Sequence, residues 1–354
     1  MLRSDTLIIT PEFLNTIAAI DEFKGAWQAL GNLAPERLSR LQYVATIESI
    51  GSSTRIEGSR LTDRDVEHLL GKIRISSFAT RDEQEVAGYA EVMELVFASW
   101  ADMPLTEGTI RQLHRELLRH STKDNWHRGA YKTASNSVAA FDADGRQIGI
   151  VFETAEPFET PRLMGELIGW ANQEFAAGRL HPLLVIGIFV VVFLEIHPFQ
   201  DGNGRLSRVL TTLLLLQHGY AFVPYCSLES VVERHKQGYY LALRQAQSTI
   251  RSDHPDWQSW LSFFLEAVHT QVTRLQAKAE REHLLASSIS PLGQQIVDHI
   301  HELGQASVAE LVKVTGANRN TVKLQLGKLV EARHIARYGA GRGTRYRPGT
   351  PPGR

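Results

Sequence analysis

The sequence predicts a mostly helical protein with one β-hairpin in its main body and a separate, smaller unit at its C-terminal end. Apolar residues recur at helical spacing along most of the 354 residues. Residues 137–152 instead alternate on both sides of the turn sequence Asp-Ala-Asp-Gly, which is typical of a β-hairpin. Residues 315–354 hold nine basic residues and one acidic residue, whereas the whole chain has a net charge of −1, so the remainder carries −9. We therefore expect two units with different partners.

Composition and length narrow the class of protein. The chain has 43% hydrophobic and 22% charged residues, as in soluble globular proteins. Its one long apolar run, residues 183–194, is too short to span a membrane, and the first residues lack the apolar core of a signal peptide. Cys226 is the single cysteine, which excludes a disulfide framework and a cysteine metal site. These features predict a cytoplasmic protein with no membrane partner.

Helices are expected through the first 120 residues, and Pro35 is acceptable in the first turn of the second one. Their expected ranges are 13–23, 35–50, 62–70, 82–100 and 106–118. After the second helix, Ser53 and Glu57 stand four residues apart, so they would share one face of a helical turn. Gly58 would end that turn.

Two segments in the middle of the chain, residues 183–194 and 206–216, are apolar all round and predict helices in the centre of a domain. Residues 161–170 predict another helix before them. The loop between the two apolar segments begins with His197, and Pro198 is expected to break the first helix there. The prediction is a buried helix, a tight polar loop and a second buried helix.

That polar loop has the groups needed to bind phosphate. Gly202 and Gly204 allow the backbone to approach a ligand closely, and the N-terminus of the following helix attracts anions. Arg205 and Arg208 lie three residues apart, hence on one helix face, and guanidinium groups suit phosphate oxygens.

Two further residues of the loop add chemistry to this anion site. Asp201 is a hard oxygen ligand of the kind that Mg²⁺ takes when it also binds substrate phosphates. His197 titrates near neutrality and could remove a proton from an attacking hydroxyl. An ordinary helix-loop-helix would explain any one of these residues, but not the set. Together they indicate phosphoryl or nucleotidyl transfer.

The stretch from His197 to Arg208, HPFQDGNGRLSR, resembles the signature H-P-F-x-[DE]-G-N-G-R-x-x-R of the Fic family. Fic enzymes typically transfer AMP from ATP to a hydroxyl of a target protein. The resemblance covers roughly residues 35–270 and implies a Fic-type helical core. It implies that His197 deprotonates a Ser, Thr or Tyr hydroxyl and that Asp201 holds Mg²⁺ on the ATP phosphates. The residues implied to bind the nucleotide phosphates are Gly202, Asn203, Gly204, Arg205 and Arg208.

The segment from Ser53 to Gly58 resembles the inhibitory motif [ST]-x-x-x-E-[GN] of the same family. The resemblance implies that Glu57 pairs bidentately with Arg208 in the place of the ATP γ-phosphate, so that ATP binds only in a pose unsuited to transfer. Taken alone, the segment would be an ordinary helix end with a solvated glutamate.

The hairpin and a later helix each have a functional and a purely structural interpretation. By resemblance, the hairpin is a flap that holds the target as an added strand, with Val138 as its candidate clamp; otherwise it covers apolar surface. Tyr239 and Tyr240, in a helix expected over 233–243, resemble the wall that stacks on adenine, although a place in the core would explain either. Gln247 stands where some Fic proteins have an asparagine near the ribose, which weakens a ribose contact.

The end of the chain resembles a winged helix-turn-helix. A helix over 256–283 leads into it, and three shorter helices and a glycine-rich ribbon follow. Residues expected near the start of the recognition helix or on the ribbon, where bases and phosphates would be reached, are Arg319, Asn320, Lys323, Arg342, Arg345 and Arg347. Winged helices also serve as protein-binding or dimer modules.

The predicted organisation has four parts. They are an N-terminal helical region with the inhibitory helix (1–110), the Fic catalytic core (111–270), a helical linker (271–289) and the winged helix-turn-helix (290–354). The predicted function is protein adenylyltransferase, inhibited by Glu57, with ATP and Mg²⁺. Alternatives are removal of AMP with Glu57 aligning water, transfer of another group, and a DNA-binding regulator whose Fic core senses nucleotide. A homodimer would suit a helix-rich regulator.

Overall fold

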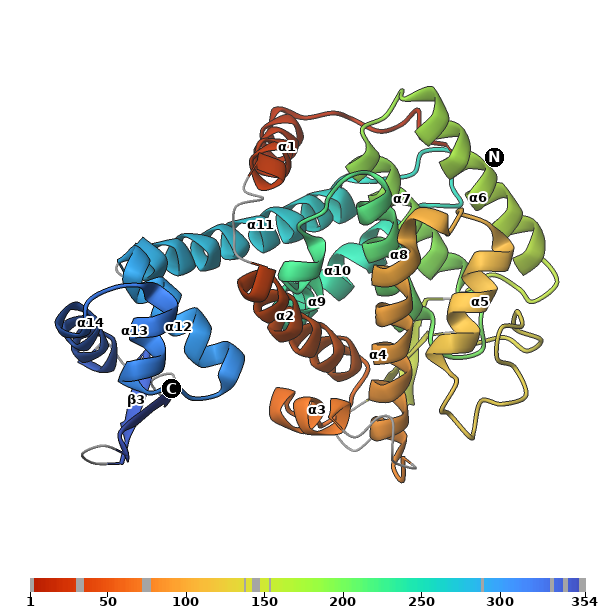
Figure 1. Cartoon of the computed structure of the whole chain (residues 1–354). Coiled ribbons are helices and arrows are strands. Elements are labelled where there is room, and N and C mark those ends of the chain that lie inside the picture. Colours follow the sequence, from red (N-terminus) through yellow and green to blue (C-terminus); the bar gives the residue numbers. More distant parts are fainter. Residues whose placement is uncertain are drawn as a thin grey trace. The chain divides into compact units, whose positions relative to one another are not determined.

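The computed structural model describes residues 3–29, 35–71, 78–136, 138–141, 147–152, 154–287, 290–331, 334–339 and 343–349 (Figure 1). These residues are mostly helical, as predicted. They form two compact units, Met1–Leu275 and Gln276–Arg354. Among the described residues, no helix combines the length and the hydropathy that crossing a membrane requires.

The first unit consists of helices and one hairpin. Its elements are α1 (Pro11–Ala29), α2 (Pro35–Ile56), α3 (Asp63–Leu70), α4 (Arg81–Ser99), α5 (Glu107–Leu117), β1 (Val138–Phe141), β2 (Gln147–Phe152), α6 (Thr160–Ala177), α7 (Pro182–Ile196), α8 (Asn203–Gln217), α9 (Leu228–Arg234), α10 (Lys236–Gln247) and the first part of α11 (Gln258–Ser287). Short 3₁₀ turns, η1 (Trp100–Asp102) and η2 (Val223–Tyr225), follow α4 and precede α9.

The expected helices are present, with two differences. The helix expected over 35–50 continues to Ile56, so it includes Ser53. The single helix expected over 233–243 is wrong, because the chain divides at His235 into α9 and α10. At that break the His235 ring lies 2.9 Å from the Val231 carbonyl oxygen, which also accepts the backbone N–H of His235.

Local sequence fixes where several helices begin. Thr62, Thr80 and Thr106 cap α3, α4 and α5, each accepting a backbone N–H from the first turn. The caps of α3 and α4 are capping boxes, in which Asp65 and Glu83 reach back to the cap backbone. Each such cap stabilises its helix by about 1 kcal/mol.

Helices α7 and α8 form the centre of the first unit. Every residue of α7 from Leu183 to Ile196 is buried, which explains why this segment is apolar all round. α6, α10 and α8 pack against α7, while α4 and α5 also pack against α8. The core therefore holds rigidly the loop that joins α7 to α8.

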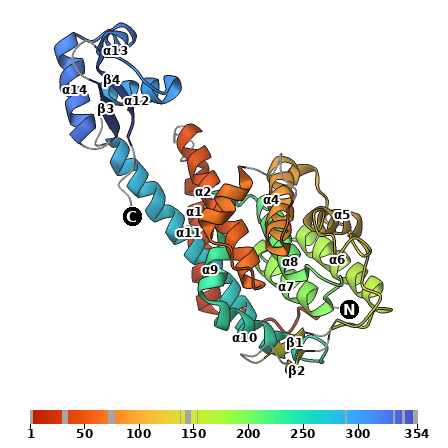
Figure 2. The same cartoon turned by 90° about the horizontal axis from the view of Figure 1, so that it is seen from below.

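The predicted hairpin is present, as antiparallel strands β1 and β2. Val138 pairs with Phe152 and Phe141 with Gln147, and the register is irregular at both ends of β1. β2 lies against α10, as Figure 2 shows. Residues 142–146, which join the strands, lie outside the described residues.

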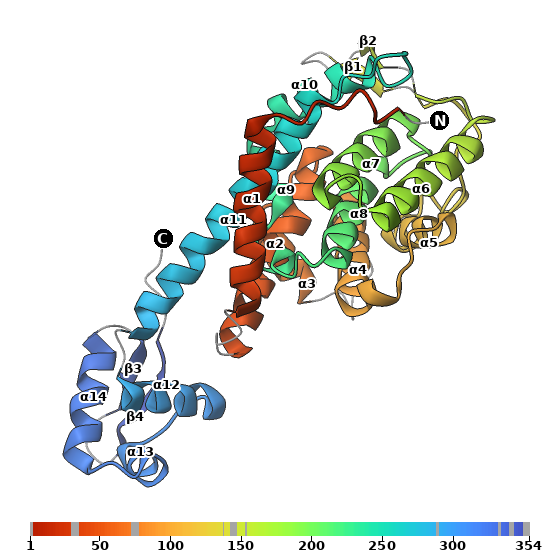
Figure 3. The same cartoon turned by 90° about the horizontal axis from the view of Figure 1, so that it is seen from above.

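The N-terminal segment before α1 passes the loop that precedes α11, as Figure 3 shows. The Trp257 indole donates to the carbonyl of Arg3 at 3.1 Å, and Gln258 donates to the carbonyl of Ile8 at 2.7 Å. These bonds attach the first residues to the start of α11.

The second unit has its own small core. Its elements after α11 are α12 (Pro291–Leu303), α13 (Val308–Thr315), α14 (Arg319–Glu331), β3 (Ile335–Tyr338) and β4 (Arg345–Pro348). The core is apolar and includes Ile296, Leu311 and Leu326. β3 and β4 form an antiparallel sheet. The order of three helices and a two-stranded hairpin is the expected one, and the winged helix-turn-helix stays a prediction.

Candidate active site

The loop that joins α7 to α8, residues 197–202, is here called the His197 loop. His197 has a left-handed backbone (φ 51°, ψ 60°), and within the described residues no other non-glycine residue has a positive φ. Such a conformation costs about 1–3 kcal/mol and persists where surrounding contacts enforce it. Gly202 is also left-handed (φ 82°), and the chain enters α8 directly after it. The predicted break at Pro198 is therefore a turn with a left-handed residue at each end, of which only His197 is strained.

Two residues from the segment before β1 bind the backbone of the His197 loop. Lys132 is 3% exposed, and its Nζ donates to the Ile196 carbonyl at 3.0 Å and to the Thr154 hydroxyl at 2.9 Å. Its backbone N–H donates to the Pro198 carbonyl at 2.8 Å. The Asn136 amide donates to the Phe199 carbonyl at 2.6 Å. These buried bonds hold the loop in its left-handed turn.

Asn203 closes the loop from the other side. Its side-chain oxygen accepts the Phe199 N–H at 2.9 Å and its amide donates to the Phe199 carbonyl at 2.7 Å. Asn203 is buried, at the first position of α8. Its side chain is thus used by the loop itself, so the nucleotide contact expected of it would come through its backbone N–H.

His114, on α5, contacts the His197 loop through a hydrogen bond and a stacked ring. Its Nδ1 accepts the Gly129 N–H at 2.9 Å, so the proton of the neutral ring is on Nε2, which donates to the Asp201 carbonyl at 3.0 Å. The ring stacks on Phe199 with 3.8 Å between centroids. Burial lowers the pKa of His114 to about 4, which keeps the ring neutral at pH 7.

The imidazole of His197 has the tautomer that a general base needs. Its Nδ1 lies 3.2 Å from the Leu194 carbonyl oxygen, which can only accept, so Nδ1 carries the proton and Nε2 keeps its lone pair. Burial lowers the pKa of His197 to about 4, and nearby Lys132 acts in the same direction. The ring is therefore neutral and able to accept a proton at pH 7.

Residues 53–58, here called the Glu57 turn, meet Arg208 of α8. Arg208 Nη2 donates to Glu57 Oε1 at 2.8 Å and to the Ser53 carbonyl at 3.0 Å, while Nε donates to Ser53 Oγ at 2.8 Å. The predicted bidentate contact is wrong in detail, because Glu57 is bonded through Nη2 alone while Nε bonds to Ser53. Burial alone would raise the pKa of Glu57, but Arg208 beside it holds that pKa below its usual value.

Gly204 makes room for the Glu57 carboxylate. A Cβ at this position of α8 would collide with Glu57 Oε1. Gly58, with φ 107°, then turns the chain away from α2. Gly204 is explained by this close approach of the turn to α8, and Gly58 by its positive φ.

Arg55 anchors the Glu57 turn, and sequence reasoning missed it. Its Nε and Nη2 donate to the two carboxylate oxygens of Glu233 at 2.6 and 3.0 Å, and its Nη1 donates to Asp63 at 2.9 Å. One arginine thus joins α2 to α9 and α3. No local pattern signals this, because Glu233 lies 178 residues away.

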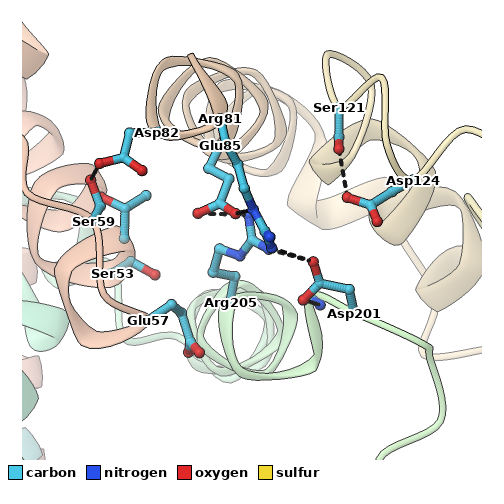
Figure 4. Close-up of polar contacts among 12 residues, drawn as sticks. Ser53, Glu57, Ser59, Arg81, Asp82, Glu85, Ser121, Asp124, Asp201 and Arg205 are labelled. Atoms are coloured by element: carbon cyan, nitrogen blue, oxygen red, sulfur yellow. Dashed lines mark hydrogen bonds and ion pairs between the residues drawn. The ribbon is translucent and has the colours of Figure 1, made fainter. Parts of the chain in front are cut away.

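Asp201 lies among charged groups in front of α8 (Figure 4). Arg81, the first residue of α4, donates to Asp201 Oδ2 at 3.0 Å and to Glu85 Oε1 at 2.7 Å. Arg205 Nη2 lies 3.5 Å from the same Asp201 oxygen, and its Nη1 lies 3.5 Å from Glu85 Oε2. Arg205 is 2% exposed, and its Nε has no hydrogen-bond partner in the described residues. A buried guanidinium with unfilled donors suits an anion.

Comparison with known proteins bears on this geometry. Residues 104–215 match the family model described as Fic/DOC family. This segment is a Fic/DOC family domain. It runs from before α5 into α8, so the Fic domain contains His114, the His197 loop, Arg205 and Arg208. The Glu57 turn and Arg81 lie outside it.

Two curated relatives are about a quarter identical to this chain over the segments that align. A protein from Drosophila virilis named protein adenylyltransferase Fic is 25% identical over 301 residues, which are 82% of this chain and 58% of that protein. Its namesake from Drosophila willistoni is 27% identical over 206 residues, 58% of this chain and 38% of that protein. The chain therefore spans 58% or less of the length of these curated relatives.

Two solved structures resemble this fold, one over nearly the whole chain and one over about three quarters of it. A Fic family protein from Desulfovibrio desulfuricans G20 is 26% identical, covers 99% of each chain and gives a TM-score of 0.66. A Fic domain containing signaling protein from Bacteroides thetaiotaomicron VPI-5482 is 27% identical and covers 73% of this chain and 95% of that one, with a TM-score of 0.59. The arrangement of helices around the Fic domain is thus a shared one.

Other residues predicted around the Fic domain are placed as follows. Tyr239 is buried and lines a pocket together with Arg208 and Trp260. Tyr240 is exposed. Gln247 is buried, and its Nε2 has no hydrogen-bond partner in the described residues. Val138 begins β1, and its side chain lies outside the described part of the structure.

A magnesium ion fits this site on the evidence of its donors. No group of three or more His, Cys, Asp or Glu side chains that could hold a metal lies within the described residues. Mg²⁺ commonly uses one or two carboxylates and completes its shell with substrate phosphates and water. Asp201 supplies one partly exposed carboxylate at the N-terminus of α8, so it fits a metal that arrives with a nucleotide.

The residues predicted to contact DNA differ in their exposure and in their contacts. Arg319, Asn320 and Lys323 are exposed at the start of α14. Arg345 is instead paired with Glu310 at 2.8 Å. Arg342 lies outside the described residues. Arg347 lies over the ring of Tyr338, 5.0 Å from its centroid.

Proposed function

We propose that this protein is a protein adenylyltransferase that moves AMP from ATP to a hydroxyl group of a target protein. The observation that carries the proposal is the convergence of His197, Asp201, Arg205 and Arg208 on the first turns of α8. This site lies in a Fic domain whose curated relatives are named protein adenylyltransferases. ATP is the nucleotide expected from those names.

His197 acts as the base in this proposal. As the hydroxyl oxygen of the target bonds to the α-phosphorus of ATP, the hydroxyl proton passes to His197 Nε2. The bond from the α-phosphorus to the bridging oxygen breaks, and pyrophosphate leaves with the electron pair. The neutral tautomer set by Leu194 is ready for this transfer.

The phosphates are held by the groups at the start of α8. The backbone N–H groups that follow Gly202 and the unfilled donors of Arg205 face a triphosphate, and Arg208 binds its γ-phosphate. Mg²⁺ bound to Asp201 would neutralise charge on the α- and β-phosphates. β1 and β2 hold the target as an added strand.

Glu57 restrains this reaction. Its carboxylate, with Ser53, takes up the guanidinium of Arg208 that the γ-phosphate needs. Losing a charge-assisted hydrogen bond costs about 1.5–3 kcal/mol, so the glutamate is a strong competitor for one arginine. ATP bound without Arg208 is misplaced for attack.

The experiment uses full-length protein with ATP labelled at the α-phosphate. Glu57→Gly should raise incorporation of label into the protein itself and into lysate proteins, and Glu57→Gly with His197→Ala should abolish it. Label at the γ-phosphate should not be incorporated. Absence of α-label incorporation by Glu57→Gly would refute AMP transfer, and incorporation of γ-label would indicate phosphoryl transfer instead.

Removal of AMP from a modified target is the second candidate. It is favoured by the ionised state of Glu57, whose negative charge acts on His197 and could align water there. Wild-type protein would then release AMP from a labelled target faster than Glu57→Gly does.

A further inference from the structure

Both oxygens of the Asp201 carboxylate already have partners. Oδ1 accepts the N–H of Gly202 at 2.7 Å. Oδ2 accepts Arg81 Nη2 at 3.0 Å, and Arg205 Nη2 lies 3.5 Å from it. Figure 4 shows Arg81 reaching from α4 across the front of α8 to this carboxylate. The carboxylate proposed to hold the metal is thus in contact with a side-chain cation.

The two arginines at Asp201 differ in how firmly they are held. Arg205 is buried on α8, four residues after Asp201, and is part of the floor of the site. Arg81 is 52% exposed and comes from another helix. Its Nε is bound by Glu85, which is 10% exposed, so the middle of the side chain is fixed while Nη2 reaches outward. Arg81 can therefore leave Asp201 without leaving Glu85.

A divalent cation and Arg81 cannot share Asp201 Oδ2 without cost. The guanidinium N–H fills one of the two lone-pair directions of that oxygen, and two cations at one oxygen repel each other, so the metal and Arg81 compete for it. We propose that Arg81 is a competing cation: it occupies Asp201 while the site is without a metal, and it moves aside when a divalent cation arrives with the nucleotide. This inference rests on the proposed function for the role of Asp201.

The competition raises the concentration of free Mg²⁺ at which the metal binds. Arg81 makes every binding event of the cation include the loss of one ion pair, so the protein needs more free Mg²⁺ than Asp201 alone would. Glu85 keeps the displaced arginine close, so it returns when the metal leaves. The ion pair is half exposed, which limits its effect to about two- to fivefold in metal affinity.

The first test measures Mn²⁺ binding by electron paramagnetic resonance, with Mn²⁺ as the probe for Mg²⁺. Full-length protein carrying Glu57→Gly is saturated with α,β-methylene ATP, which cannot transfer AMP. Adding Arg81→Ala should lower the dissociation constant of Mn²⁺ about two- to fivefold. Arg64→Ala, which removes an exposed arginine on α3, is the matched control and should leave it unchanged. An unchanged or weaker affinity in Arg81→Ala would overturn the proposal.

The second test follows Arg81 itself through its reaction with phenylglyoxal, quantified by mass spectrometry. Release from Asp201 predicts faster labelling of Arg81 after Mn²⁺ and α,β-methylene ATP are added together. Slower labelling would mean that Arg81 moves onto the phosphates, and unchanged labelling would mean that it stays on Asp201; either result overturns the proposal. Neither test needs turnover, so a protein that passes both but transfers no AMP would refute the proposed function alone.

Discussion

The His197 loop and the Glu57 turn both place charged or titratable groups against the start of α8, but different forces hold them. The loop is held by hydrogen bonds from buried side chains, among them Lys132 and Asn203. The turn is held by ion pairs whose carboxylates are partly exposed, Glu57 at 33% and Glu233 at 28%. The first set is lost only when the core opens, whereas the second is accessible to water and salt.

This difference shows which part of the site can be regulated. Leaving a buried acceptor without a donor costs about 1–3 kcal/mol, so the loop has one conformation. The partly exposed ion pairs of Arg55 with Glu233 and Asp63 are worth about 0–1 kcal/mol each and weaken with salt. The base is therefore permanently placed, and the Glu57 turn is the part that a partner or a second copy of the chain could release.

The largest effect is expected from Lys132→Met, which disrupts the buried hydrogen bonds that hold the His197 loop. It removes the donor from the Ile196 carbonyl and the Thr154 hydroxyl and frees His197 from its left-handed turn. In the Glu57→Gly background we expect a loss of about 3 kcal/mol in the free energy of unfolding and about 100-fold in kcat. Urea denaturation and labelling from α-labelled ATP measure these quantities.

The matched control is Lys123→Met, which removes an exposed lysine from the same stretch of chain. It should change the unfolding free energy by less than about 0.5 kcal/mol. If Lys132→Met behaved like this control in both measurements, the loop would not depend on its buried donors.

A smaller effect is expected from Arg55→Ala, which disrupts the ion pairs that hold the Glu57 turn. The substitution removes the contacts to Glu233 and Asp63 but leaves Glu57 and Arg208 intact. If these partly exposed contacts sum to about 1.4 kcal/mol, AMP incorporation by otherwise wild-type protein should rise about tenfold. Arg60→Ala, an exposed neighbour, is the control.

The same substitution in the Glu57→Gly background separates regulation from damage. Because Arg55 would act through Glu57, no further rise is expected there. A tenfold rise in both backgrounds would show that Arg55 acts on another step, and a fall in both would show that it supports the fold of the site.

Much of the frame of this site was predictable from local patterns. Apolar periodicity gives the helices, and the run over 183–194 gives the buried α7. The alternation around residues 137–152 gives the hairpin. The signature gives the loop with its base, glycines and arginines in the right order, because all of these lie within twelve residues.

The contacts of Arg81 and Arg55 were not predictable, because they join distant residues of common type. Arg81 and Asp201 are 120 residues apart, and Arg55 and Glu233 are 178 apart. A surface-helix arginine gives no sign of its partner. The pairing of Glu57 with Arg208 was predicted from the family resemblance, but as a bidentate contact. Sequence alone could not show that Ser53 takes the Nε of the arginine.

The smallest effect is expected in the titration of His197, whose ring should stay neutral from pH 8 to 5.5. Burial lowers the pKa of His197 to about 4, so at pH 5.5 only about 3% of the ring should be protonated, against about 90% for an ordinary histidine of pKa 6.5. Its ring signals in nuclear magnetic resonance spectra, assigned by their loss in His197→Asn, should therefore stay constant from pH 8 to 5.5. Since Lys132 lowers this pKa and Glu57 raises it, Lys132→Met should move it up and Glu57→Gly down. A midpoint near 6.5 in the wild-type protein would mean that water reaches the ring, and the loop would then be no more closed than the Glu57 turn.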